Sequence, residues 1–120
     1  FTKICLALEQ TGGDLYISGI DEKLLREKAG NELVLLQNKL GKNVLVHILC
    51  QKSQSDGIVF QNYQKKVVSD ATPLIPCFVY KNRVAIAILG NPIHVAILYN
   101  ESLAKNHIGT FNLLSTWSKK

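Results

Sequence analysis

The stretch of sequence that decides the fold reads Cys77-Phe-Val-Tyr80, then Lys81-Asn-Arg83, then Val84-Ala-Ile-Ala-Ile-Leu89. The two apolar runs have the length of β-strands, and the asparagine between them tolerates the positive φ angle that a tight turn needs. These runs therefore predict a β-hairpin. Gly90-Asn-Pro92 predicts a second turn, and the apolar segment Ile93–Tyr99 predicts a third strand after it.

A helix is expected after these strands. Asn100 suits the N-cap position, where a side-chain oxygen satisfies a free backbone N–H group. Lys119 and Lys120 stand at the C-terminal end, where the helix dipole favours positive charge. The apolar side chains recur at helical spacing and form one face, which consists of Ala104, Ile108, Phe111, Leu114 and Trp117.

The first half of the chain has the pattern of a strand–helix–strand unit. Asp14–Ser18 is a short apolar run of strand length, and Asn43–Cys50 is nearly continuously apolar, as in a strand that is covered on both faces. Between them, Asp21 is a candidate N-cap, and Gly41 ends the helical pattern. The apolar stripe of this helix consists of Leu25, Ala29, Leu33, Leu36 and Leu40. Such a unit places two parallel strands in one sheet.

The remaining segments complete the predicted architecture. Residues 1–10 read as the end of a helix, and residues 51–57 as a polar loop. Residues 58–66 fit a short helix or an irregular segment, and Val67-Val68 fits a short strand. The whole pattern predicts an α/β fold with a mixed sheet and flanking helices.

Length and composition indicate one globular domain over residues 1–120. The chain is 47% hydrophobic and 19% charged, which is enough apolar sequence for a single core. Its apolar runs are far shorter than the roughly 20 residues of a membrane span, so no membrane partner is expected. Because the sequence begins at Phe1 and not at Met, we expect a fragment that lacks an upstream domain.

Three cysteines, Cys5, Cys50 and Cys77, lie among apolar neighbours. They form no C-x-x-C or C-x-x-H pair, so neither zinc nor a disulfide framework is indicated. Buried free thiols are typical of a reducing compartment, and we expect the protein in the cytoplasm.

The net charge of +5 lies in the second half of the chain. Residues 1–50 carry six basic and six acidic side chains, whereas residues 51–120 carry eight basic and three acidic ones. A basic face attracts phosphate backbones. No basic run exceeds the pairs Lys65-Lys66 and Lys119-Lys120, and few aromatic residues alternate with the charges. A solvated surface is the main interpretation, and direct nucleic-acid binding is the alternative.

Polar residues at the ends of the first two predicted strands form the candidate ligand site. Ser18 and Gly19 end one strand just before the helix capped at Asp21, and Gln51 and Lys52 follow the next strand. Open α/β sheets bind ligands beyond the carboxyl ends of their strands, near helix N-termini. The sequence therefore predicts ligand-binding roles for these four residues, against the alternative of a plain polar rim.

The histidines give little support for catalysis or metal binding. His47 alternates with apolar residues inside a strand pattern, and His107 lies beside the apolar face of the last helix, so both are expected to pack in the structure. His94 would begin an H-x-K-x-x-x-x-D motif, but Ala96 replaces its lysine and Glu101 its aspartate. Phosphate-bond hydrolysis by a nucleophilic histidine needs a cation to hold the phosphate oxygens. No catalytic residue, metal ligand or cofactor is predicted.

Several segments, in order along nearly the whole chain, resemble the effector-binding part of TrmB-type transcription regulators. They are Tyr16-Ile-Ser-Gly19, the "G-K-N-V-L-V-H-I-L" strand at 41–49, the hairpin at 78–89, and the ending Asn100-Glu-Ser-Leu-Ala-Lys105 with Phe111 and Trp117. Proteins of this family join a winged-helix DNA-binding domain to a degenerate phospholipase-D-like module. The resemblance implies one phospholipase-D-like half, in which the catalytic His, Lys and Asp positions fall on Leu74, Pro76 and Lys81. None of these three residues supports that chemistry.

The resemblance implies a non-catalytic sensor and dimerisation domain of a transcription regulator. The expected partners are a second copy of the chain, a small-molecule effector, and DNA bound through the upstream domain. The dimer is expected to weaken on Trp117→Ala or Phe111→Ala if the terminal helix contributes to it. The alternatives are a nucleic-acid-binding or nucleic-acid-processing protein that uses the basic second half, and a phosphodiesterase of phospholipase-D type.

Overall fold

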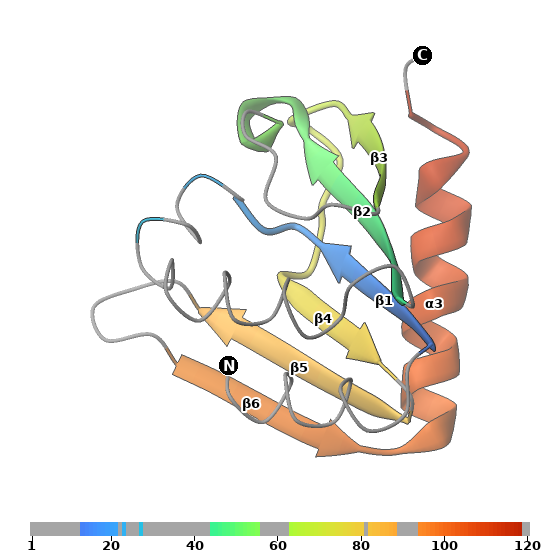
Figure 1. The fold of residues 1–120 in the computed structure, drawn as a ribbon. Coiled ribbons are helices and arrows are strands. Elements are labelled where there is room, and N and C mark those ends of the chain that lie inside the picture. Colours follow the sequence, from blue (N-terminus) through green and yellow to red (C-terminus); the bar gives the residue numbers. More distant parts are fainter. Residues whose placement is uncertain are drawn as a thin grey trace.

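The computed structural model describes residues 13–21, 23, 27, 44–55, 63–80, 82–88 and 94–118. Within these residues the fold is a six-stranded mixed sheet with a helix across one face (Figure 1). The strands are β1 (Gly13–Ser18), β2 (Val44–Gln51), β3 (Tyr63–Val68), β4 (Cys77–Tyr80), β5 (Arg83–Ile88) and β6 (His94–Tyr99). A short 3₁₀ turn η1 (Lys52–Gln54) follows β2, and the helix α3 spans Glu101–Ser115. The predicted α/β class is confirmed.

The sheet has the order β3-β2-β1-β4-β5-β6. Strand β1 pairs in parallel with β2, and β2 with β3, whereas the pairs β1–β4, β4–β5 and β5–β6 are antiparallel. Strand β1 therefore lies between two parts of the sheet. On one side β2 and β3 run parallel to it, and on the other side the hairpin β4–β5 and strand β6 pair in antiparallel fashion. The register sets Ser18 opposite Leu49 on one side and opposite Cys77 on the other.

Alternation along the strands creates two apolar faces. On one face, α3 packs its Ala104 in a cluster with Cys77, Val79 and Val84. Further along the helix, Phe111 joins a second cluster. That cluster contains Leu49, Val68 and Phe111, with Tyr16, Leu74 and Leu114 packed against it. The opposite face is also buried, at Leu15, Ile17, Ile48, Phe78 and Tyr80.

Side chains at both ends of helix α3 form hydrogen bonds with backbone groups of its terminal turns. The Oδ1 atom of Asn100 accepts the N–H of Leu103 at 2.9 Å, which confirms the predicted N-cap. The helix ends at Ser115, two residues before Trp117. Trp117 therefore lies in the following turn and is 60% exposed, whereas Phe111 is only 8% exposed. The prediction that Trp117 belongs to the packed face of the helix was wrong.

Strand β3 is longer than the sequence indicated. Only Val67-Val68 was expected in a strand, but the pairing with β2 begins at Tyr63. Strand β3 lies at the edge of the described sheet, and its polar residues Gln64, Lys65 and Lys66 interrupt any apolar alternation in the sequence.

Other expectations lie outside the described residues. These are the helix at 1–10, the whole apolar stripe from Leu25 to Leu40, Gly41, Cys5, Lys81 and the turn at 90–92. At the start of the expected second helix, the N–H of Lys23 donates to Asp21 Oδ1 at 3.0 Å, as expected for the capping residue.

Candidate ligand-binding pocket

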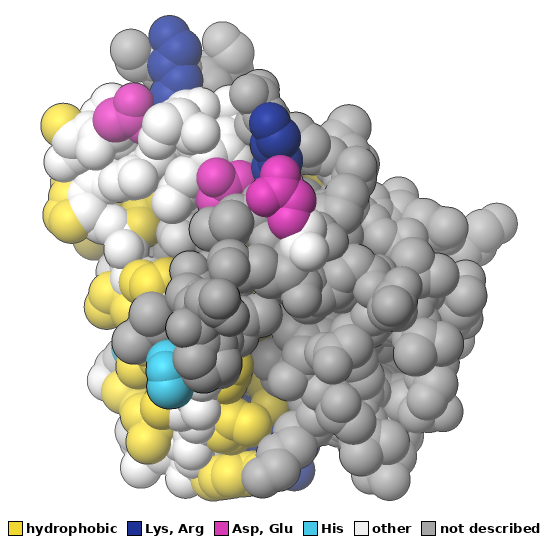
Figure 2. Space-filling model, turned by 90° about the vertical axis from the view of Figure 1, so that its left-hand side faces the viewer, with side chains coloured by type: hydrophobic (Ala, Val, Ile, Leu, Met, Phe, Trp, Pro, Cys, Tyr) yellow, Lys and Arg dark blue, Asp and Glu magenta, His cyan; other side chains and the backbone are white. Residues whose placement is uncertain are grey.

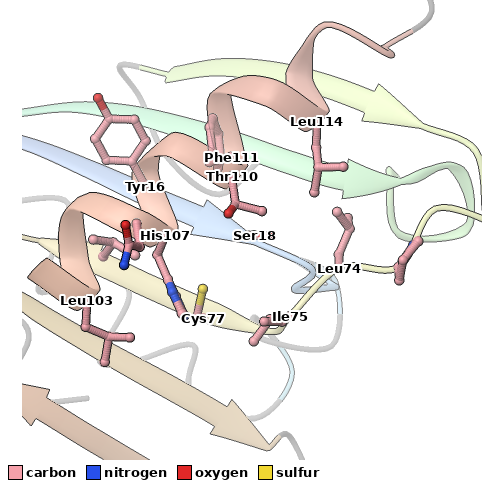
Figure 3. Close-up of a pocket in the computed structure, with 13 residues that line it drawn as sticks. Tyr16, Ser18, Leu74, Ile75, Cys77, Leu103, His107, Thr110, Phe111 and Leu114 are labelled. Carbon is pink, nitrogen blue, oxygen red and sulfur yellow. The ribbon is translucent and has the colours of Figure 1, made fainter.

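A pocket of about 440 Å³ lies between α3 and the sheet (Figure 3). Strands β1 and β4 form its floor, the segment that leads into β4 forms one wall, and α3 forms the other. The lining residues are Tyr16, Ser18, Pro73, Leu74, Ile75, Cys77, Val79, Leu103, Asn106, His107, Thr110, Phe111 and Leu114. A cavity of this size is in the range of small-molecule sites, which run from roughly 300 to 1,000 Å³.

The walls of the pocket are mainly apolar. Cys77 and Val79 contribute from β4, Leu74 and Ile75 from the segment before it, and the helix adds three large side chains, Leu103, Phe111 and Leu114. Burial of apolar ligand surface against such walls is favourable by roughly 25 cal/mol per Å². Affinity for a ligand would therefore come mainly from its apolar part.

His107 supplies a polar atom that the described structure leaves unsatisfied. Its Nε2 atom is buried and has no hydrogen-bond partner. In Figure 3 its ring points from α3 toward the thiol of Cys77. An unpaired buried polar atom costs about 1–3 kcal/mol, and because this atom is buried, no group in the pocket touches it in this geometry.

Tyr16 lines the pocket and also contacts His47, which forms a polar pair with Asp14 near the start of β1. Its ring stacks on His47 with the ring centroids 4.5 Å apart and meets Phe111 edge-on at 5.2 Å. His47 Nε2 in turn lies 3.2 Å from Asp14 Oδ2. Burial and, secondarily, the charge of Asp14 raise the pKa of Tyr16, so its hydroxyl is protonated at neutral pH.

Cys77 forms part of the floor as a neutral thiol. Burial raises its pKa to about 11. Because the thiolate is the nucleophilic form of cysteine, this side chain is an apolar wall at neutral pH and not a nucleophile.

Two of the four residues that the sequence placed in a ligand site lie at this pocket. Ser18 lines it, and Gly19 shapes its wall. Gly19 has a φ of +65°, and a Cβ at this position would lie 3.1 Å from Leu74 Cβ and 3.2 Å from the carbonyl of Ile75. Glycine is therefore what lets the chain segment before β4 approach the end of β1.

Gln51 and Lys52 lie apart from the lining. The Nε2 atom of Gln51 donates to the carbonyl oxygens of Thr72 at 2.8 Å and Asp70 at 3.3 Å. Gln51 thus anchors the turn from which the wall at 73–75 continues. Lys52 is exposed and begins η1. Ser18 and Gly19 thus lie together at the pocket. Gln51 does not line it, but its hydrogen bonds hold the turn that precedes the pocket wall.

The sequence did not assign His107, Tyr16 or the segment Pro73–Ile75 to the site. His107 was expected only to pack. The signal that could have found it is its position in the apolar stripe of α3, three residues after Ala104 and four before Phe111. Where α3 crosses the sheet depends on contacts distant in sequence.

The described residues contain no group of three or more His, Cys, Asp or Glu side chains that could hold a metal ion. Among the same residues, no helix has the length and apolar character needed to cross a membrane.

Comparison with known proteins agrees with this fold. No protein-family model and no curated protein matches the sequence. Among solved structures, the chain is similar to TrmBL2, described as an archaeal chromatin protein that shows a novel mode of DNA binding, with a TM-score of 0.63 and 11% sequence identity. The match covers 99% of this chain and 48% of TrmBL2, so the chain spans about half the length of that protein. At this identity the likeness establishes a shared fold, in agreement with the TrmB-like resemblance of the sequence.

Proposed function

We propose that this chain is a non-catalytic sensor and dimerisation domain of a TrmB-like transcription regulator. The observation that carries the proposal is a small-molecule-sized pocket within a fold that TrmBL2 shares. In the proposal, the pocket binds an effector, an upstream domain binds DNA, and the domain acts in the cytoplasm without metal or cofactor.

The chemistry of the pocket supports binding rather than catalysis. Leu74, at the position where the phospholipase-D-like resemblance implies histidine, is an apolar lining residue. Pro76 takes the place of the lysine, and Lys81, at the aspartate position, lies outside the described residues. Cys77 is protonated at neutral pH. We therefore propose that the domain hydrolyses no phosphodiester.

Exposed apolar side chains support assembly with a second copy. Edge strand β6 pairs only with β5 among the described residues, and it exposes Val95, Leu98 and Tyr99. Hydrophobic side chains also gather on the lower part of the face in Figure 2, at the level of β5 and β6. Antiparallel pairing of β6 with its copy is self-complementary about a two-fold axis, and it would pair the backbone groups of this edge and place its apolar side chains beside those of the copy.

Two of the described basic side chains, Arg83 and Lys105, have partners within the domain. The guanidinium of Arg83 lies over the rings of Tyr80 and Tyr99, at 5.9 and 5.0 Å from their centroids. Lys105 pairs with Glu101 at 3.0 Å. In the proposal, DNA is contacted by the upstream domain.

Chromatin immunoprecipitation of the natural protein that contains this chain tests the regulator proposal. We expect the epitope-tagged protein to be enriched at discrete promoter regions, and residues 1–120 alone to bind duplex DNA weakly and without sequence preference. No enrichment above an untagged strain would contradict regulation. Submicromolar, salt-resistant DNA binding by residues 1–120 would instead support the nucleic-acid-binding alternative.

A further inference from the structure

We infer that a second copy of the chain pairs with β6 in one particular register, with the two-fold axis at Ile97. This inference deepens the proposed dimer and rests on it, because the proposal names the edge of the sheet but not the residues that meet there.

The two edges of the described sheet, β3 and β6, differ in their protection against pairing (Figure 1). Strand β3 carries Gln64, Lys65 and Lys66, and lysine side chains are a common protection of an edge strand. Strand β6 contains no Lys, Arg, Asp, Glu or Pro. It pairs along its whole length with Arg83–Ile88 of β5 and has no bulge. Strand β6 therefore lacks the features that keep an edge from pairing with another chain.

The side chains of β6 project alternately to the two faces of the sheet. Leu98 lies opposite Val84, which belongs to the cluster that packs against Ala104 of α3, so the even-numbered residues of β6 lie on the α3 face. The odd-numbered residues on the other face are Val95, Ile97 and Tyr99.

This alternation limits where the two-fold axis can lie. An axis that relates two antiparallel strands of one sheet is perpendicular to the sheet, so it keeps each face on its own side. Residues that lie opposite each other across the axis must therefore belong to the same face. Because the faces alternate along β6, the axis falls at a residue and never between two residues. The same symmetry makes the two sheets continuous, with both α3 helices on one face.

An axis at Ile97 matches the apolar side chains of the two strands. Tyr99, which is 67% exposed, then lies opposite Val95 of the second copy. Leu98, which is 43% exposed, lies opposite Ala96 of the second copy, and Ile97 meets its own copy. Cross-strand pairs of aromatic and β-branched side chains stabilise a sheet.

The two neighbouring registers pair these side chains less completely. An axis at Ala96 places Tyr99 opposite a residue that precedes β6. An axis at Leu98 places Val95 opposite a residue of helix α3, which is outside the sheet. Only the axis at Ile97 keeps both of these exposed side chains opposite strand residues.

Tyr99 is held in place before a second copy binds. The guanidinium of Arg83 lies 5.0 Å from the centroid of its ring and 5.9 Å from that of Tyr80. An ordered side chain loses less conformational entropy on association than a free one. A copy of β6 also brings no like charge to this edge, because the strand lacks Lys, Arg, Asp and Glu. These features favour a copy of the same strand over a charged partner.

Disulfide cross-linking of the 120-residue chain tests the register. Ile97→Cys, Ala96→Cys and Leu98→Cys are each oxidised with diamide and run on a denaturing gel without reductant. At the axis two Cα atoms are about 4.5–5.5 Å apart, which suits a disulfide, whereas residues 96 and 98 are diagonal to their own copies at about 7–8 Å. We expect at least about five times more cross-linked dimer from Ile97→Cys than from either neighbour. The unsubstituted chain is the blank, and its described cysteines, Cys50 and Cys77, are buried.

A mixture of two variants keeps the test independent of the folding of Ile97→Cys. Val95→Cys and Tyr99→Cys, the second with a short tag that changes its mobility, are mixed before oxidation. They should form a mixed cross-linked dimer that neither forms alone, because only the axis at Ile97 sets these two positions opposite each other. Circular dichroism checks the fold of every variant.

Two results would overturn the inference. Strongest cross-linking of Ala96→Cys or Leu98→Cys, without the mixed dimer, would move the axis away from Ile97. No cross-linking above the blank in any variant or in the mixture would remove β6 as the interface.

This inference and the regulator proposal fail separately, because cross-linking is measured without DNA and promoter enrichment without cross-linking. Cross-linking at Ile97 without promoter enrichment would leave the interface and remove the regulator. Enrichment without any cross-linking would leave the regulator and remove this interface.

Discussion

At the scale of single residues, Gly19 controls how the pocket wall meets the sheet. Its φ of +65° is unfavourable for other residues, and an added Cβ would press on Leu74 and Ile75. Its N–H also donates to the carbonyl of Leu49 at 3.0 Å, which fixes the end of β1 against β2. A substitution here should therefore affect both backbone strain and packing.

We predict that Gly19→Ala lowers the free energy of unfolding by about 1–3 kcal/mol, as expected for strained backbone. The matched control is Gly109→Ala in α3, where a Cβ would meet nothing within 4 Å. That change should stabilise the protein by roughly 0.5–1 kcal/mol, because alanine favours the helix. Urea denaturation measures both effects. Equal stability changes at the two glycines would contradict this account of Gly19.

Asp70 gives the turn before the pocket wall a pH dependence. Its Oδ1 atom accepts the N–H of Ser53 at 2.9 Å, and this hydrogen bond lowers the pKa of the carboxyl. A group whose pKa is lower in the folded state contributes stability above its unfolded pKa. That contribution is lost as the pH falls through the folded value.

Asp70→Asn should therefore reduce the loss of stability on acidification below about pH 4, the ordinary range for aspartate. Urea midpoints at pH 7 and pH 3, measured for both proteins, provide the test. We expect a smaller difference between the two midpoints for the variant. An unchanged difference would show that the contact with Ser53 does not contribute to acid sensitivity.

At the scale of elements, the sequence predicted the parts that depend on local pattern. Apolar runs of strand length located β1, β2, β4, β5 and β6 with ends displaced by at most one residue, and Asn100 located the start of α3. Strand β3 was mostly missed, because its exposed Gln64 and Lys66 carry no apolar signal. An edge strand takes its structure from its partner, which a local pattern does not record.

The part of the candidate site that depends on local sequence pattern was predictable, and the part that depends on distant contacts was not. Ser18 and Gly19 follow from a general rule about strand ends, because their position depends only on the end of β1. His107 lies near Ser18 because α3 packs across β1 and β4. The position of the helix on the sheet is set by core contacts, such as the cluster that contains Ala104 and Val79. These contacts bridge segments that are distant in the chain.

The burial of Phe111 yields a prediction for α3. Phe111→Ala removes a ring packed in the cluster with Leu49 and Val68, and it should lower the free energy of unfolding by about 3–5 kcal/mol. Trp117→Ala, at a 60% exposed side chain beyond the helix, should change it by less than about 1 kcal/mol. Thermal or urea unfolding distinguishes the two. A larger effect at Trp117 would mean that α3 packs differently.

At the scale of the whole molecule, we predict a homodimer at micromolar concentration with β6 at its interface. Leu98→Lys should weaken the dimer, because it places a charge among the exposed apolar side chains of that edge; Leu98 is 43% exposed and Tyr99 is 67% exposed. The control is Asn112→Lys, which adds the same charge at an exposed polar position of α3 and should leave the dimer intact. Sedimentation velocity measures both variants.

A clean monomer of 13.3 kDa at high concentration would contradict the predicted dimer. A dimer that is lost on Trp117→Ala and retained on Leu98→Lys would move the interface from β6 to the turn after α3.

Effector binding in the pocket between α3 and the sheet can be measured by an NMR titration. The chain is labelled with ¹⁵N and mixed with the small-molecule extract of the organism that makes it. We predict that amide shifts concentrate at the lining residues, including Ser18, Cys77 and His107, while the exposed residues Gln64 and Lys66 of β3 stay unchanged. Shifts centred away from the pocket, or no shifts at all, would contradict effector binding in the pocket.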